Sequence, residues 1–122
     1  RKGSHHLKAE IFCETPVLDK GNDSATLEIS VLRARNLHAA DRGGTSDPYI
    51  RMHIGDAVKE CIKTKVIKKT LNPEFGETFR IRIPGPQRAN RFTVECFDYD
   101  MLGADDSLGK NDFDLESLAF DQ

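Results

Sequence analysis

Aspartates gather in two short stretches of the sequence, and their spacing suggests a metal site. One stretch pairs Asp41 with Asp47, and the other carries Asp98, Asp100 and Asp106. Carboxylates that fold to within a few ångströms of one another repel, so their pKa values rise unless a cation neutralises them. Oxygen donors with no histidine or cysteine among them favour calcium over zinc or copper. The pattern therefore predicts a calcium site made by two loops.

The second stretch has the length of an EF-hand calcium loop, but it lacks two of that loop's ligands. With Asp98 as the first position, Gly103 falls correctly at the position of the sharp turn. Leu102 then occupies a ligand position, and Gly109 stands where a bidentate glutamate is needed. The EF-hand is therefore excluded. For either stretch taken alone, a solvated turn that is merely rich in aspartate remains the alternative.

Strands are expected on both sides of these stretches, because apolar and polar residues alternate there. The alternating segments are 7–13, 27–32, 49–54, 61–69, 79–83, 92–97 and 108–115. About seven strands, with turns roughly every 8 to 15 residues, indicate an all-β antiparallel sandwich. A short helix is considered for one stretch alone, 112–120. The length of 122 residues is that of one domain.

Three ordered motifs closely resemble those of the C2 domain family. They occupy residues 41–49, 69–75 and 97–109. The resemblance extends over roughly residues 25–118, and it implies a Greek-key β-sandwich of about eight strands with calcium-binding loops at one end. It also implies that residues 7–122 form a single C2 domain. Residues 1–6 look like a tag or cloning remnant.

The resemblance assigns the calcium ligands residue by residue. In calcium-binding members of the family, aspartates of two apical loops hold the ions. The positions that match them here are Asp41, Asp47, Asp98, Asp100 and Asp106. The backbone carbonyls of Arg42 and Tyr99 are further ligands by the same resemblance. Asp105 is an additional acid beside the cluster. At most, it is expected to contact the ligands of the ion and not the ion itself.

The loops are expected to dock on anionic membranes when calcium is bound. Bound ions reverse the negative charge of the loop tips, and each unit charge near an anionic surface is worth about 1 kcal/mol. The resemblance places Met101 and Leu102 at a tip that enters the headgroup layer. Burial of one such side chain contributes about 1.5–3 kcal/mol. The alternative is that Leu102 folds back against its own loop.

A run of basic residues forms a second candidate site. Lys63 and Lys65 flank Thr64, so they point to the same side of a strand. Family members that this chain resembles bind phosphoinositide headgroups on this surface. The candidate contacts are Lys63, Lys65, Lys68, Lys69, Arg51 and His53. An ordinary solvated strand face is the alternative. Nucleic acid is not expected, because the net charge is −2 and no aromatic residues interleave the lysines.

The predicted function is calcium-dependent binding of anionic phospholipid membranes, with phosphatidylserine and phosphoinositides as candidate lipids. The module would bring a larger intracellular protein to the membrane, so it is expected in the cytoplasm and peripherally on membranes. An odd number of cysteines, namely Cys13, Cys61 and Cys96, suits a reducing compartment. The alternative function is a protein–protein interaction module in which calcium only stabilises the loops.

Catalysis is not expected of this chain. It contains no G-x-S-x-G, no H-E-x-x-H and no glycine-rich phosphate loop. No apolar run approaches the roughly 18 residues that a membrane-spanning helix needs. Seven strands are expected where the resemblance implies eight. Either the N-terminal stretch supplies a strand in the family's alternative circular permutation, or a sheet edge stays open, in which case pairing of two copies or strand exchange is expected.

Overall fold

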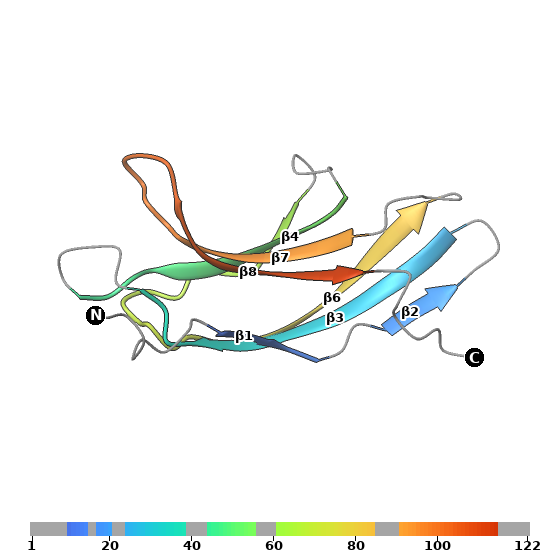
Figure 1. The fold of residues 1–122 in the computed structure, drawn as a ribbon, viewed down its shortest axis with the longest axis horizontal. Helices are drawn as coiled ribbons and strands as arrows, with labels where there is room; N and C mark the ends of the chain where they lie inside the picture. Colours follow the sequence, from blue (N-terminus) through green and yellow to red (C-terminus); the bar gives the residue numbers. More distant parts are fainter. Residues whose placement is uncertain are drawn as a thin grey trace.

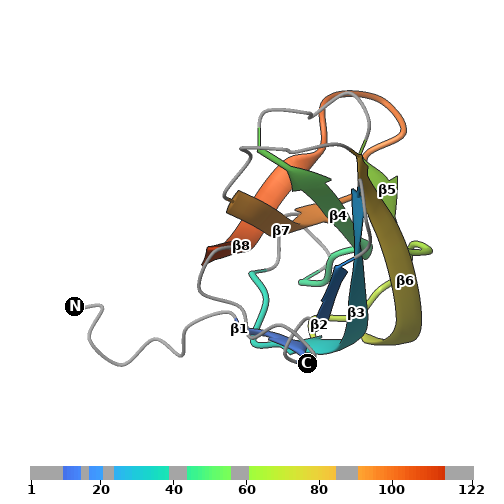
Figure 2. The same cartoon turned by 90° about the vertical axis from the view of Figure 1, so that its right-hand side faces the viewer.

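Two antiparallel sheets make up the fold. The structure, a computed structural model, describes residues 10–14, 17–20, 24–38, 44–55, 61–84 and 91–114. Within these ranges it has eight strands and no helix. The sheets lie in two layers, with β4, β7 and β8 in one and β1, β2, β3 and β6 in the other (Figure 1, Figure 2). The β-sandwich expected from the alternating segments is therefore confirmed.

The first sheet is organised around its longest strand, β3 (Ser24–Arg35). On one side of β3 lie two short strands, β1 (Glu10–Cys13) and β2 (Val17–Lys20), each paired with a different part of it. On the other side, β6 (Glu74–Pro84) pairs with β3 along most of its length. Leu27, Ile29 and Val31 of β3 are buried, because alternate side chains point to the same face of a strand.

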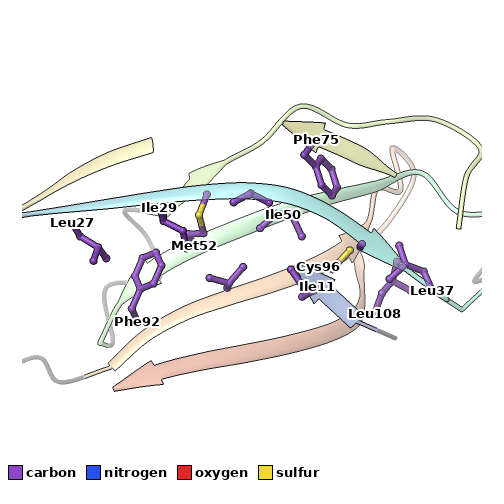
Figure 3. Close-up of a cluster of buried hydrophobic side chains, with 13 residues drawn as sticks. Ile11, Leu27, Ile29, Leu37, Ile50, Met52, Phe75, Phe92, Cys96 and Leu108 are labelled. Carbon is purple, nitrogen blue, oxygen red and sulfur yellow. The ribbon is translucent and has the colours of Figure 1, made fainter. Parts of the chain in front are cut away.

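The second sheet carries the aspartates of interest. Its strands run in the order β5 (Ile62–Lys63), β4 (Pro48–Ile54), β7 (Arg91–Asp98) and β8 (Asp106–Asp114). The inward-facing side chains of β4 and β7 are fully buried against those of β3 (Figure 3). They are Ile50, Met52, Phe92, Val94 and Cys96. The intervening residues of β4 and β7 therefore form an outer face, whose chemistry is described below.

Burial also settles the state of two cysteines. It raises the pKa of the Cys13 thiol to about 11 and that of the Cys96 thiol to about 12. Both groups therefore stay protonated near neutral pH, which makes them poor nucleophiles. All three cysteines are free thiols. The interpretation of Cys96 as a small core residue is confirmed by its complete burial.

Replacing Phe92 with alanine should lower the free energy of unfolding by about 3–5 kcal/mol, because a buried ring is lost and a cavity remains. Urea unfolding followed by circular dichroism measures the change. The matched variant Phe12→Ala removes the same ring from a position that is 38% exposed. It should cost less than about 2 kcal/mol. Equal losses in the two variants would contradict the assignment of Phe92 to the core.

Two sequence-based expectations are corrected by the strands observed, and one strand was not predicted. The segment 61–69 is a strand only at Ile62–Lys63. The Thr64 hydroxyl lies 2.9 Å from the Ile50 nitrogen and accepts its N–H, where a regular ladder would use a backbone carbonyl. The helix considered for 112–120 is wrong for residues 112–114, which belong to β8, and the rest lies outside the described residues. The strand β2 was not predicted, because four residues give too short an alternation.

Candidate calcium-binding site

Strand pairing brings three of the predicted aspartates to one end of the second sheet. Asp47 immediately precedes β4, Asp98 is the last residue of β7, and Asp106 is the first residue of β8. Asp98 is the ladder partner of Pro48 on one side and of Asp106 on the other. The loop that joins β7 to β8 rises from this end of the sheet, as the orange loop in Figure 1 shows. Asp47 and Asp98, 51 positions apart in sequence, thus become neighbours through backbone register.

Asp98 and Asp47 lock three segments of chain together. Asp98 is 9% exposed, and its Oδ1 accepts the backbone N–H of Asp47 at 2.8 Å. The Asp47 Oδ1 in turn accepts the N–H of Lys69 at 2.8 Å, and its carbonyl oxygen accepts the N–H of Tyr99 at 3.0 Å. Lys69 has a φ of 56°, a left-handed backbone conformation that is uncommon in residues other than glycine. These carboxylates therefore have a structural role as well as their proposed role as ligands.

The loop between β7 and β8 is closed by its own aspartates. The Asp100 Oδ1 accepts the N–H of Leu102 at 2.9 Å, which makes a tight turn. At this turn Met101 is 78% exposed and Leu102 is 94% exposed. The alternative in which Leu102 folds back against the loop is therefore wrong. Two large apolar side chains stand in solvent at the tip of an acidic loop.

The predicted ligand set is gathered only in part by the described residues. Asp41 and Arg42 lie outside them. Within the described ranges, no three histidine, cysteine, aspartate or glutamate side chains are close enough together to hold a metal ion. Oxygens of Asp47, Asp98 and Asp100 are turned toward backbone N–H groups instead. The donor set still fits calcium, because it consists of carboxylate and carbonyl oxygens alone.

Asp105 has contacts that sequence reasoning missed. Its Oδ1 accepts the N–H of Asp100 at 2.8 Å. Its Oδ2 accepts the hydroxyl of Tyr49 and lies 3.8 Å from Nη2 of Arg51. Burial by itself would raise the pKa of this carboxyl. The hydrogen bonds from Tyr49 and Asp100 and the charge of Arg51 outweigh burial and hold that pKa below its ordinary value. Asp105 therefore belongs to the outer face of the second sheet as well as to the loop.

Arg51 is the centre of that outer face. Its guanidinium carbon lies 3.8 Å from the centroid of the Phe97 ring, within the range of a cation–π contact. Its Nη2 donates to the Tyr49 hydroxyl at 2.9 Å. Lys63 is the ladder partner of Arg51 on β5, so the two side chains share a face. The only sequence signal for this arrangement was the alternation of Tyr49 and Arg51 on one strand.

The other residues predicted to contact a lipid headgroup differ in their exposure and in their hydrogen bonds. Lys63 and Lys65 are both exposed, on either side of the buried Thr64, but only Lys63 belongs to β5, so their pointing to the same side stays a prediction. Lys68 is exposed, as is Lys69, whose backbone N–H binds Asp47. His53 lies on the same face of β4 as Arg51, and its Nδ1 is 3.0 Å from the carbonyl oxygen of Gly55.

Comparison with known proteins explains this combination of sandwich and acidic loops. The C2 domain family model matches residues 25–122. The chain belongs to the C2 domain family. The resemblance predicted from the three motifs is therefore confirmed, and the two sheets described above are those of a C2 domain.

Relatives of this C2 domain occur within much longer proteins. Human synaptotagmin-5 is 37% identical over 94 residues, which are 76% of this chain and 24% of that protein. The chain therefore spans about a quarter of the length of this relative. No helix in the described ranges has the length and apolar character needed to cross a bilayer.

Two solved structures have the same fold. The first of them, a C2 domain of RIM from Drosophila, superimposes with a TM-score of 0.70 and covers 91% of this chain and 89% of its own, at 23% identity. The paired C2 domains of extended synaptotagmin 2, in a calcium-bound structure, give a TM-score of 0.62 at 28% identity. That match covers 75% of this chain and 34% of the other.

Proposed function

We propose that this C2 domain binds anionic phospholipid membranes in a calcium-dependent manner and thereby targets a larger protein to them. The observation that carries the proposal is the arrangement of Asp47, Asp98 and Asp106 at one sheet end, below a loop tip that exposes Met101 and Leu102. An acidic base and an apolar tip on one loop are the two parts that such a switch requires. A relative of known structure was solved with calcium bound.

The proposed ligands are the two groups of aspartates identified in the sequence. They are Asp41, Asp47, Asp98, Asp100 and Asp106. When bound, calcium supplies positive charge at loops that are otherwise negative. The carboxylates orient the loop end, since Asp98 and Asp47 already tie the neighbouring segments together through hydrogen bonds. The chain need not change shape for its surface potential to reverse.

Met101 and Leu102 provide the apolar part of the proposed membrane contact. Their exposure means that they bury surface only when a partner covers them, and the acyl region of a bilayer is such a partner. Electrostatic attraction and apolar burial then act at the same loop. The attraction depends on calcium, whereas the burial supplies affinity that salt does not screen.

The outer face of the second sheet is the proposed second contact with lipid. The basic side chains proposed to contact lipid on or beside this face are those of Lys63, Lys65, Lys68, Lys69, Arg51 and His53. Exposed lysines at this face would attract the phosphates of phosphoinositide headgroups. The proposed location is the cytoplasmic surface of membranes, where anionic lipids are concentrated, and the proposed role is binding without catalysis.

Sedimentation with phosphatidylserine vesicles tests the proposal. The chain should sediment with vesicles in calcium and remain in the supernatant in chelator, and vesicles of neutral lipid alone should not sediment it. Equal binding in calcium and in chelator would show that the switch is wrong. Calcium binding without any vesicle binding would instead favour the interaction module, in which calcium stabilises the loops.

A further inference from the structure

An internal carboxylate contacts two potential anion-binding groups on the outer face. The Asp105 side chain, which is 16% exposed, lies against the Tyr49 hydroxyl and 3.8 Å from Nη2 of Arg51. Arg51 and Tyr49 project from β4, whereas Asp105 comes from the loop before β8. The contact therefore joins segments that are far apart in the sequence.

The donors around Asp105 are held in place independently of it. The Arg51 guanidinium is stacked on Phe97, and its hydrogen bond to the Tyr49 hydroxyl fixes its direction. The Tyr49 ring is itself stacked on Phe97, with centroids 5.9 Å apart. Lys63 stands beside Arg51 as its exposed ladder partner. A guanidinium, a hydroxyl and an ammonium group on one face are the donors that bind a phosphate.

We propose that Asp105 is a specificity-determining residue, which acts as an internal anion and limits the affinity of this face for phosphorylated headgroups. The inference rests on the proposed headgroup surface and deepens it. A phosphate that approaches Arg51 meets the charge of Asp105 and competes with it for Nη2 and for the Tyr49 hydroxyl. Lipid docking by this chain is consequently governed by the calcium loops, and the basic face contributes little until Asp105 is displaced.

Asp105→Asn removes the charge while keeping the shape of the side chain. The amide oxygen of asparagine still accepts the N–H of Asp100, so the loop retains its closing hydrogen bond. The amide NH2 then replaces Oδ2, so the charge opposite Arg51 and the acceptor of the Tyr49 hydroxyl are both lost. Asp112→Asn is the matched control: Asp112 lies on β8 of the same sheet, and its Oδ1 accepts the Thr93 hydroxyl at 2.8 Å. An amide oxygen preserves that bond as well.

The test is calorimetric titration of each variant with inositol 1,4,5-trisphosphate in the presence of chelator, and with inorganic phosphate in a parallel series. Asp105→Asn should bind inositol trisphosphate about five- to tenfold more tightly than the unmodified chain. Asp112→Asn should differ from the unmodified chain by less than about twofold. Adding Arg51→Gln to Asp105→Asn should remove the gain. Sedimentation with vesicles that contain phosphatidylinositol 4,5-bisphosphate completes the series.

Each outcome decides the proposal. A gain in solution and on vesicles supports it with a lipid headgroup as ligand, and a gain in solution alone supports it with a soluble phosphate as ligand. Equal gains in Asp105→Asn and Asp112→Asn overturn it in favour of overall charge. No gain in Asp105→Asn overturns it, and the headgroup surface still stands if Lys63→Gln with Lys65→Gln weakens binding. If no variant binds phosphate, the proposed role of Asp105 and the proposed headgroup surface both fail. Calcium-dependent sedimentation with phosphatidylserine vesicles still tests the proposed function separately.

Discussion

Replacing Asp98 and Asp100 together with asparagine should abolish calcium-dependent sedimentation with phosphatidylserine vesicles. Both residues are proposed ligands, and the charge count of the ligands is a main determinant of calcium affinity. We expect the calcium affinity to fall by more than about a hundredfold. Calorimetric titration with calcium, without vesicles, measures this step directly, and sedimentation then measures its consequence for docking.

The substitution is designed to leave the loops folded. Asparagine keeps an oxygen that accepts the Asp47 N–H in place of Asp98 and the Leu102 N–H in place of Asp100. The free energy of unfolding in chelator should therefore change by less than about 1 kcal/mol. Asp112→Asn removes a carboxylate from β8 outside the proposed site and should leave calcium affinity unchanged. Calcium-dependent sedimentation that survives in the double variant would refute the ligand assignment.

The placement of Asp47 and Asp98 at one end of a sheet was predictable from the sequence because local patterns determine it. The alternation in 92–97 places Asp98 at the end of a strand, and Pro48 marks the start of another directly after Asp47. Antiparallel pairing of these two strands then brings both residues to the same end of a sheet. The EF-hand was excluded by residue types alone. The family resemblance supplied the ligand roles, which the alternation does not contain.

The contacts of Asp105 could not be predicted in the same way. They depend on the register between β7 and β8, where an irregularity between Cys96 and Phe97 shifts the pairing, and on the path of the intervening loop. No spacing in the sequence shows which side of the loop a given acid will face. Asp105 was thus expected beside the calcium cluster, whereas its carboxylate is bound to Tyr49 and Arg51.

The end of β5 illustrates a second limit on what the sequence pattern can predict. The apolar–polar alternation continues from 61 to 69, but the strand stops at Lys63. It stops there because the Thr64 hydroxyl accepts the Ile50 N–H in place of a backbone carbonyl. Side-chain hydrogen bonds to the backbone are specific to the folded arrangement, and an apolar–polar pattern does not encode them. Lys63 is the last residue of the strand and Lys65 lies beyond it, so strand alternation does not relate the directions of these two side chains.

Replacing Met101 and Leu102 together with serine should weaken calcium-dependent binding to phosphatidylserine vesicles without changing calcium affinity in solution. The two side chains are 78% and 94% exposed, so they contribute little to the folded domain and bury surface only on docking. Burial of each contributes about 1.5–3 kcal/mol, which corresponds to at least about a tenfold loss of affinity per residue. Sedimentation at several vesicle concentrations gives the affinity.

The salt dependence of the same variant separates insertion from attraction. Because the electrostatic part of docking is screened by salt and the apolar part is not, rising salt should lower the vesicle affinities of the serine variant and of the unmodified chain by the same factor, and the difference between them should persist at high salt. Phe12→Ala, which shortens another exposed apolar side chain on β1, should leave vesicle affinity unchanged. Unaltered vesicle binding in the serine variant would mean that the loop tip stays outside the bilayer. Docking would then rest on the charge reversed at the aspartates alone.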